Sequence, residues 1–131
     1  MSSPEPLAGL APGETERARW AAEQVGAPGT KVVAGWLVLT SSRCLFYRRA
    51  GLLGGGRPDG EPVYSVALLD LRSVVPCSFP MAIGYGDRYF LPGVELDGAA
   101  FRLGRQAVSA DVVSAIDTAR HSSSPPGPTP T

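Results

Sequence analysis

Residues 31–49 limit the possible folds more than any other part of this sequence. They read KVVAGWLVLT, a Ser-Ser pair and RCLFYRR, so two runs rich in β-branched, aromatic and aliphatic residues flank a short polar turn. This pattern predicts a β-hairpin. Side chains alternate between the two faces of a strand, and both faces of the first arm are apolar, one with Leu37 and Leu39 and the other with Trp36 and Val38. We therefore expect a central strand that is covered on both sides.

Four more segments carry strand signals. Residues 63–71 and 73–79 are rich in Val and Leu, and Pro76 predicts that the second of them is an edge strand or contains a break. Residues 93–96 and 99–103 flank an Asp-Gly pair, which readily adopts positive φ angles and predicts a tight hairpin. Four side chains of this hairpin are expected to face the core: Val94, Leu96, Phe101 and Leu103.

The segment 14–25, ETERARWAAEQV, is compatible with two structures. Its Ala, Glu and Arg residues favour a helix, whereas Trp20 and Val25 suit the edge of a sheet. The sequence leaves a helix and a first strand as open alternatives.

Near the end of the chain the hydrophobic pattern changes to a helical period. Residues 106–120 carry an apolar stripe of Val108, Val112, Ala115, Ile116 and Ala119. One amphipathic helix after about six strands is suited to plug the open end of a bent sheet. Residues 1–13 and 121–131 are rich in Pro, Ser and Gly and are expected to be disordered, so the predicted domain is 14–120.

Three motifs resemble the GRAM domains of the pleckstrin-homology (PH) superfamily. Residues 10–14, LAPGE, are similar to the Pro-Gly-Glu start of those domains, and GWLVLT at 35–40 with RCLFY at 43–47 is similar to their hairpin. Residues 66–74, VALLDLRSV, are similar to the strand and turn that follow a variable loop. The resemblance implies a mainly β, PH-like fold, a bent antiparallel sheet or partly open barrel of six to seven strands capped by one C-terminal helix. It also implies a non-catalytic binding module, which in this superfamily commonly takes anionic lipids or protein segments.

Composition excludes several function classes. The 12 basic and 12 acidic residues cancel, so no overall field attracts nucleic acid. Two cysteines, Cys44 and Cys77, and a single His121 are too few for a zinc site and leave no nucleophile–histidine pair in the predicted domain, so we expect no metal, no cofactor and no enzyme. The sequence shows neither a signal peptide nor a run of apolar residues that would span a bilayer, and we expect a cytoplasmic protein, free or peripheral at a membrane.

The best candidates for an anion site are the cationic residues of the first hairpin and its loops. Guanidinium groups bind phosphate oxygens through parallel hydrogen bonds, and the set comprises Lys31, Arg43, Arg48, Arg49 and Arg57. On a regular strand Arg48 and Arg49 point to opposite faces. The first hypothesis is therefore recognition of an anionic lipid headgroup by these residues.

The alternative hypothesis is a protein-interaction or homo-oligomerisation module. Leu52 and Leu53, in a glycine-rich connection, and Tyr85 and Tyr89, around another loop, are the candidate contact residues. A third hypothesis, a small-ligand carrier, would require a cavity between the sheet and the helix.

Overall fold

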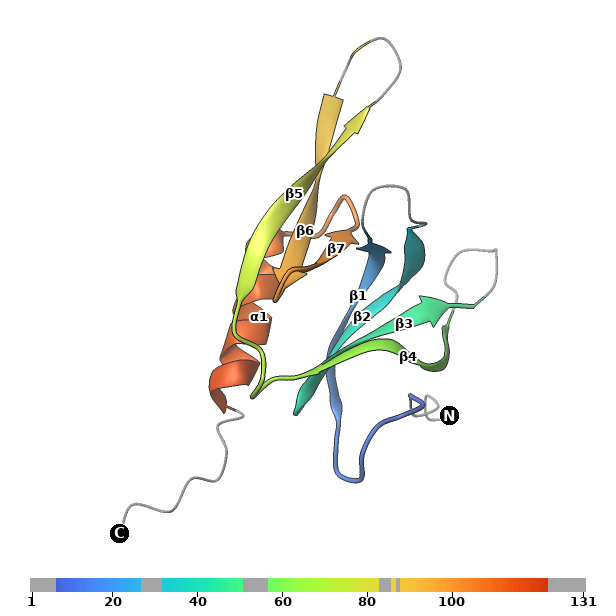
Figure 1. Ribbon diagram of the computed structural model, residues 1–131, viewed down its shortest axis with the longest axis vertical. Helices are drawn as coiled ribbons and strands as arrows, with labels where there is room; N and C mark the ends of the chain where they lie inside the picture. The colour runs from blue at the N-terminus through green and yellow to red at the C-terminus, as the bar shows by residue number, and fades with distance from the viewer. Residues whose placement is uncertain (1–6, 27–31, 51–56, 83–85, 87, 123–131) are drawn as a thin grey trace.

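The chain forms one seven-stranded antiparallel sheet and one helix (Figure 1). The computed structural model describes residues 7–26, 32–50, 57–82, 86 and 88–122. The elements are β1 (Glu16–Val25), β2 (Val33–Thr40), β3 (Arg43–Arg49), β4 (Pro58–Ala67), β5 (Val74–Ala82), β6 (Arg88–Leu96), β7 (Ala99–Leu103) and α1 (Ser109–Ser122). The strand order is β4-β3-β2-β1-β7-β6-β5, with α1 lying against β5 and β6. The predicted PH-like fold, mainly β with one C-terminal helix, is confirmed.

The segment 14–25, for which the sequence left a helix and a strand open, forms a strand from Glu16 onward. Residues of β1 pair with β2 over almost their whole length, and with β7 only from Ala22 to Val25. Pairing with β2 and β7 outweighs the local helix propensity of this segment, because β1 joins the two halves of the sheet. The helix is shifted relative to the prediction: it begins at Ser109 and ends at Ser122, so it includes His121.

The main core lies between the two halves of the sheet and α1. Its centre is aromatic, because the Phe101 ring lies 5.3 Å from the Phe46 ring and 5.2 Å from the Tyr64 ring, measured between centroids. Leu37 and Leu39 of β2 are buried in this core. The four hairpin residues predicted to face it are buried as well: Val94, Leu96, Phe101 and Leu103. The apolar face of α1 closes this core with Val112, Ile116 and Ala119.

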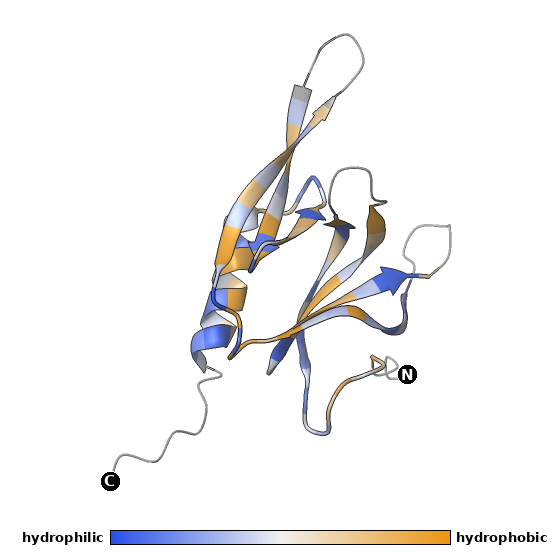
Figure 2. Cartoon of the chain, viewed as in Figure 1, coloured by the Kyte–Doolittle hydropathy of each residue, from blue (hydrophilic) through white to orange (hydrophobic). Residues whose placement is uncertain are grey.

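A second apolar cluster covers the opposite face of β2 and β3. Buried Val38, Leu45 and Tyr47 pack there against Leu7 and Leu10 of the N-terminal segment. The Tyr47 hydroxyl also donates a hydrogen bond of 2.6 Å to the carbonyl oxygen of Ala8. Part of the N-terminal segment 1–13, for which the sequence predicts disorder, thus contacts the sheet. A sheet that is apolar on both faces needs a second cover, and this segment supplies part of it. Figure 2 shows the apolar residues along the strands of this half of the sheet.

The turn between β6 and β7 carries more than the predicted hairpin. Asp97 and Gly98 have φ angles of 49° and 90°, as a tight turn of this kind requires. The Asp97 carboxylate also accepts hydrogen bonds from the backbone N–H groups of Arg72 and Ser73, at 3.1 and 2.7 Å. One residue thus fixes both the β6–β7 turn and the start of β5.

Strand β5 is an edge strand, as Pro76 predicted. The N–H of Asp97 donates to the carbonyl of Ser73, so these two residues form a hydrogen-bonded pair, and every second residue after Ser73 faces β6. The nitrogens of Pro76 and Pro80 therefore point away from the sheet. The exposed edge lacks two of the N–H groups that a foreign strand would need.

The hairpin of β5 and β6 extends past the rest of the sheet. Strand β7 pairs with β6 only over residues 93–96, whereas β5 and β6 remain paired to Ala82 and Arg88. Residues 78–82 and 88–92 therefore form a two-stranded ribbon, here named the β5–β6 arm, that projects beyond β7 (Figure 1). The Ser109 hydroxyl fixes α1 at the base of this arm, because it accepts from the Gly93 N–H at 3.0 Å and donates to the Cys77 carbonyl at 3.4 Å.

The close approach of β2 and β3 predicts that one methyl group added at Gly35 lowers the stability of the fold strongly. A Cβ added at Gly35 would overlap the carbonyl oxygen of Tyr47 and lie 2.8 Å from Cζ of Phe46. We expect Gly35→Ala to lower the free energy of unfolding by about 2 kcal/mol or more, measured by urea denaturation. Gly104→Ala is the matched control, because a Cβ there meets no atom within 4 Å. Equal stability of the two variants would contradict the close approach.

Candidate functional site

The structure separates the predicted anion-binding residues. Arg48, Arg49 and Arg57 lie where β3 ends and β4 begins, whereas Arg43 is the first residue of β3. Six residues of strand span roughly 20 Å, so Arg43 does not share a site with Arg49. Lys31, Leu52, Leu53 and Tyr85 lie outside the described residues.

Arg43 instead fixes the N-terminal segment to the sheet. Its Nε and Nη2 donate to the two carboxylate oxygens of Glu14 at 2.9 and 2.7 Å, and Nη2 also donates to the Gly9 carbonyl at 2.7 Å. The hydroxyls of Thr40 and Ser42 donate to the same carboxylate, at 2.6 and 3.0 Å. The donors of Arg43, one of the predicted anion-binding residues, are thus used within the fold.

The electrostatics of Glu14 reflect this arrangement. Its side chain is only 2% exposed, and burial alone would raise the pKa of the carboxyl. The hydrogen bonds from Arg43 outweigh burial, and with those from Thr40, Ser42 and the Ala11 N–H they lower the pKa of Glu14 to about 2. The carboxylate is therefore ionised whenever the protein is folded near neutral pH.

Arg48 and Arg49 lie on opposite faces of β3, as their alternation predicted. Arg48 is exposed and lies opposite Asp59 of β4. Arg49 is half-buried, and its guanidinium carbon lies 5.3 Å from the centroid of the Trp36 ring. Trp36 lies on the face of the sheet that also carries Val38 and Tyr47, here called the outer face. Arg57 is exposed, and its carbonyl accepts a hydrogen bond from the Ala50 N–H. Only Arg49 combines partial burial with a position over a hollow.

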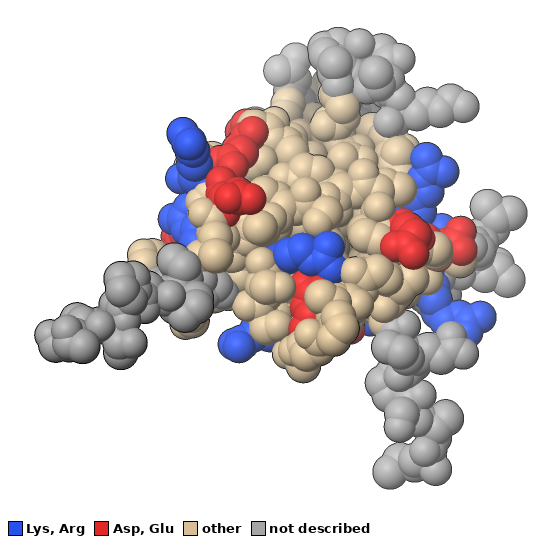
Figure 3. Space-filling model, turned by 60° about the horizontal axis from the view of Figure 1, so that its bottom comes forward, with Lys and Arg blue, Asp and Glu red and all other residues tan. Residues whose placement is uncertain are grey.

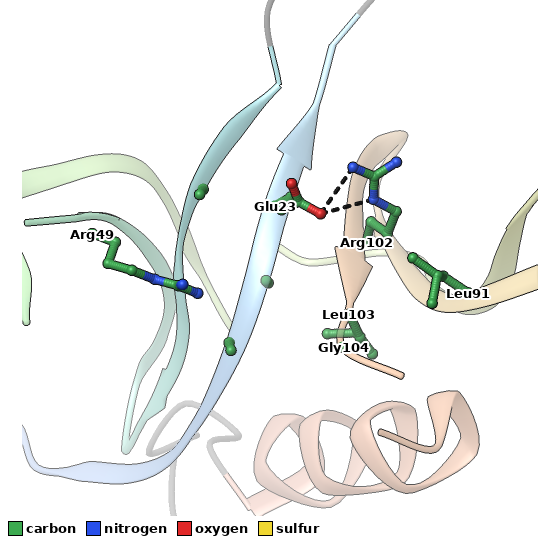
Figure 4. Close-up of a pocket in the computed structure, with 9 residues that line it drawn as sticks. Glu23, Arg49, Leu91, Arg102, Leu103 and Gly104 are labelled. Atoms are coloured by element: carbon green, nitrogen blue, oxygen red, sulfur yellow. Dashed lines mark hydrogen bonds and ion pairs between the residues drawn. The ribbon is translucent and has the colours of Figure 1, made fainter. Parts of the chain in front are cut away.

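This hollow, named the Arg49 pocket, has a volume of about 230 Å³ and lies across β1, β2 and β7 (Figure 4). Glu23 of β1 stands in it opposite Arg102 of β7, and Nε of Arg102 donates to the Glu23 carboxylate at 2.9 Å. Arg49 extends from β3 on the other side of Glu23. Small and aliphatic side chains form the remaining walls: Ala21, Ala22, Ala34, Leu91 and Leu103.

The hydrogen-bonding state of Arg49 distinguishes it from the other residues of the pocket. Its Nε is buried and has no hydrogen-bond partner within the described parts of the chain. A buried donor without an acceptor costs about 1–3 kcal/mol, and more when the group is charged. Because Arg102 and Glu23 compensate each other, the pocket retains one positive charge, on the Arg49 guanidinium.

Two arginines lie over the Trp36 ring, and their hydrogen bonding differs. The guanidinium carbon of Arg19 lies 5.9 Å from the same ring centroid, but Arg19 donates to the two carboxylate oxygens of Glu16 at 2.6 and 2.7 Å. Stacking on the ring face leaves the N–H groups in the plane of a guanidinium available. Arg19 donates these N–H groups to Glu16, while Nε of Arg49 has no acceptor in the part of the chain that the structure describes.

The charged side chains of the face in Figure 3 form no single basic patch. Arg residues lie beside Asp and Glu residues and are separated by uncharged surface. Among the described residues, no group of three His, Cys, Asp or Glu side chains is placed to hold a metal ion. Burial raises the pKa of the Cys44 thiol to about 12, so this cysteine is not a reactive thiolate. No helix in the described ranges is long and apolar enough to cross a membrane.

A second hollow, of about 420 Å³, lies between β1 and α1. Ala18, Leu39 and Ala119 form its apolar part, but exposed polar residues border it, among them Arg17 and Asp111. An apolar ligand held there would remain largely in contact with water. The carrier hypothesis gains nothing from this geometry.

The sequence offered Arg49 as one of five candidates but gave no sign of its surroundings. Glu23 and Arg102 are 79 residues apart in the sequence and meet because β1 pairs with β7. Tyr89, the described member of the predicted tyrosine pair, is half-buried on the β5–β6 arm with the Arg105 guanidinium carbon 4.9 Å from its ring centroid.

In comparisons with known proteins, no family model, no curated protein and no solved structure matches the chain.

The Glu14–Arg43 pair predicts a specific loss of stability in acid. The pKa of Glu14 is about 2 in the folded protein and near 4.5 in the unfolded chain, so its contribution is complete above pH 4.5 and is lost as the pH falls toward 2. We expect Glu14→Gln to lower the free energy of unfolding at neutral pH by on the order of 2–3 kcal/mol, with the difference from wild type shrinking over that window. Urea denaturation at a series of pH values measures this.

The control for this prediction is Glu16→Gln, which removes a carboxylate from a solvent-accessible pair. Such pairs contribute at most about 1 kcal/mol. A difference between Glu14→Gln and wild type that stays constant from neutral pH to pH 2 would contradict the account.

Proposed function

We propose that the protein is a non-catalytic, GRAM-like binding module that recognises an anionic lipid headgroup in the Arg49 pocket. The observation that carries the proposal is the buried Nε of Arg49, which has no acceptor among the described residues although it stands beside a hollow. A phosphate or carboxylate oxygen is the acceptor that a guanidinium binds most strongly.

The size of the pocket favours a headgroup over a whole lipid. Its volume of about 230 Å³ equals that of roughly eight water molecules. A phosphate group with a small polar substituent fits this space, whereas an acyl chain would have to remain outside it. The ligand would therefore be an anion presented at a surface, with its apolar part held by the membrane.

The chemistry of the described residues supports binding over catalysis. Cys44 is buried with a raised pKa, and the ring Nδ1 of His121 lies 2.7 Å from the Asp117 carbonyl oxygen in the last turn of α1. Neither residue lines the Arg49 pocket. Recognition without reaction is the function that these features favour.

Arg49→Gln tests the proposal by co-sedimentation with phosphatidylcholine vesicles that contain or lack phosphatidylserine, at low and at physiological salt. We expect wild-type protein to bind the anionic vesicles only, and more weakly as salt rises. Loss of one charge-assisted hydrogen bond at Arg49 should weaken binding about tenfold. Inorganic phosphate as a competitor distinguishes a site for free phosphate from one for a lipid headgroup, because only the former would be saturated by dilute phosphate.

The matched control is Arg19→Gln, which removes the same charge from the same face and the same Trp36 ring. Because Arg19 is held by Glu16, we expect its loss to change vesicle binding little. Equal weakening by both substitutions would indicate general charge attraction and contradict a site at Arg49. No vesicle binding, together with a concentration-dependent mass in solution, would favour the protein-interaction alternative.

A further inference from the structure

One face of the β5–β6 arm carries exposed apolar residues. A ribbon of two strands has no third layer: Phe79 and Leu91, paired on one face, are half-buried, whereas Pro80 and Phe90, paired on the opposite face, are exposed. Phe90 is 65% exposed, the highest fraction among the large apolar side chains of the residues that the structure describes. Val108, next to the arm's base at Ser109, is 54% exposed. This surface is therefore more apolar than a ribbon in water requires.

Cationic side chains flank the apolar residues on the other face of the arm. The Arg105 guanidinium carbon lies 4.9 Å from the Tyr89 ring centroid, and Nη1 of Arg102 lies 3.3 Å from Sδ of Met81. Leu91 and Arg102 also line the Arg49 pocket, so the arm is continuous with that site. Aromatic side chains bordered by arginines are the composition that suits the interface of an anionic bilayer.

The backbone of the arm disfavours a protein strand as the occupant. The outward-facing nitrogens of Pro76 and Pro80 remove hydrogen-bond donors from the free edge of β5. A strand added there would leave its own carbonyl groups without partners at two positions. A lipid surface takes up apolar side chains without requiring any backbone pairing.

We propose that the β5–β6 arm inserts into the boundary between headgroups and acyl chains of the membrane, with Phe90 as its main anchor. This inference rests on the proposed function, because the inserted arm lies beside the pocket that takes the anionic headgroup. The pocket supplies selectivity for charge and the arm supplies apolar contact. Transfer of a Phe side chain out of water corresponds to roughly a tenfold gain in membrane binding or more.

A fluorescent probe at position 90 tests the insertion. Phe90→Cys in a Cys77→Ser background is labelled with the environment-sensitive dye NBD; Cys44 is fully buried with a pKa of about 12 and should not react. With phosphatidylserine-containing vesicles we expect a blue-shifted, stronger emission that is quenched by lipids carrying a nitroxide near the carbonyl of the acyl chain. Leu69→Cys, at a position that is 55% exposed between β4 and β5, is the control and should keep its emission in water.

The outcomes separate this inference from the proposed function. If the labelled protein binds anionic vesicles in an Arg49-dependent way but the probe at position 90 does not respond, insertion is overturned and the headgroup site stands. If the protein binds no vesicles, both are overturned. A response at position 90 that appears with rising protein concentration in the absence of lipid would identify a contact between protein copies and overturn insertion. Phe90→Ser in co-sedimentation should weaken binding to anionic vesicles about tenfold, and unchanged binding would also contradict the proposal.

Discussion

The structure depends on covering a hairpin that is apolar on both faces. Strands β2 and β3 bury Leu37 and Phe46 on one side and Val38 and Tyr47 on the other. The second half of the sheet and α1 cover the first side. Part of the second side is covered by residues 7–13, which have no regular structure and are held by the Glu14–Arg43 pair. The ion pair thus serves the fold, because without it the apolar outer face would lose its cover.

The same outer face shows how the chain uses its arginines. Four of them are paired with carboxylates in the described structure: Arg19, Arg43, Arg102 and Arg120. Arg49 lies over Trp36, its Nε has no acceptor among the described residues, and a hollow adjoins it. A protein with no net charge can still carry a local positive charge in this way, because the paired charges around Arg49 cancel. The β5–β6 arm adds an apolar surface next to this hollow.

Much of the fold follows from local sequence signals. The Ser-Ser turn, the Asp97-Gly98 pair and Pro76 each specify backbone geometry within a few residues, and the structure confirms both hairpins and the edge strand. The site was less predictable because it depends on strand register. The partner of Arg43 is 29 residues away and that of Arg102 is 79 residues away, and no local pattern shows either contact. The contacts of residues 7–13 with the sheet also escaped prediction, since the apolar face that these residues pack against lies elsewhere in the sequence.

Side-chain NMR of the arginine Nε–H groups tests the central claim most directly. Titration of the full chain with a soluble, short-chain phosphatidylserine below its critical micelle concentration would present the headgroup without a membrane. The account predicts a saturable shift of the Arg49 Nε–H signal, with Arg19 and Arg43 nearly unchanged because their donors are already bound to carboxylates. Equal, non-saturating shifts of all arginines, or none at Arg49, would contradict the assignment of the anion site.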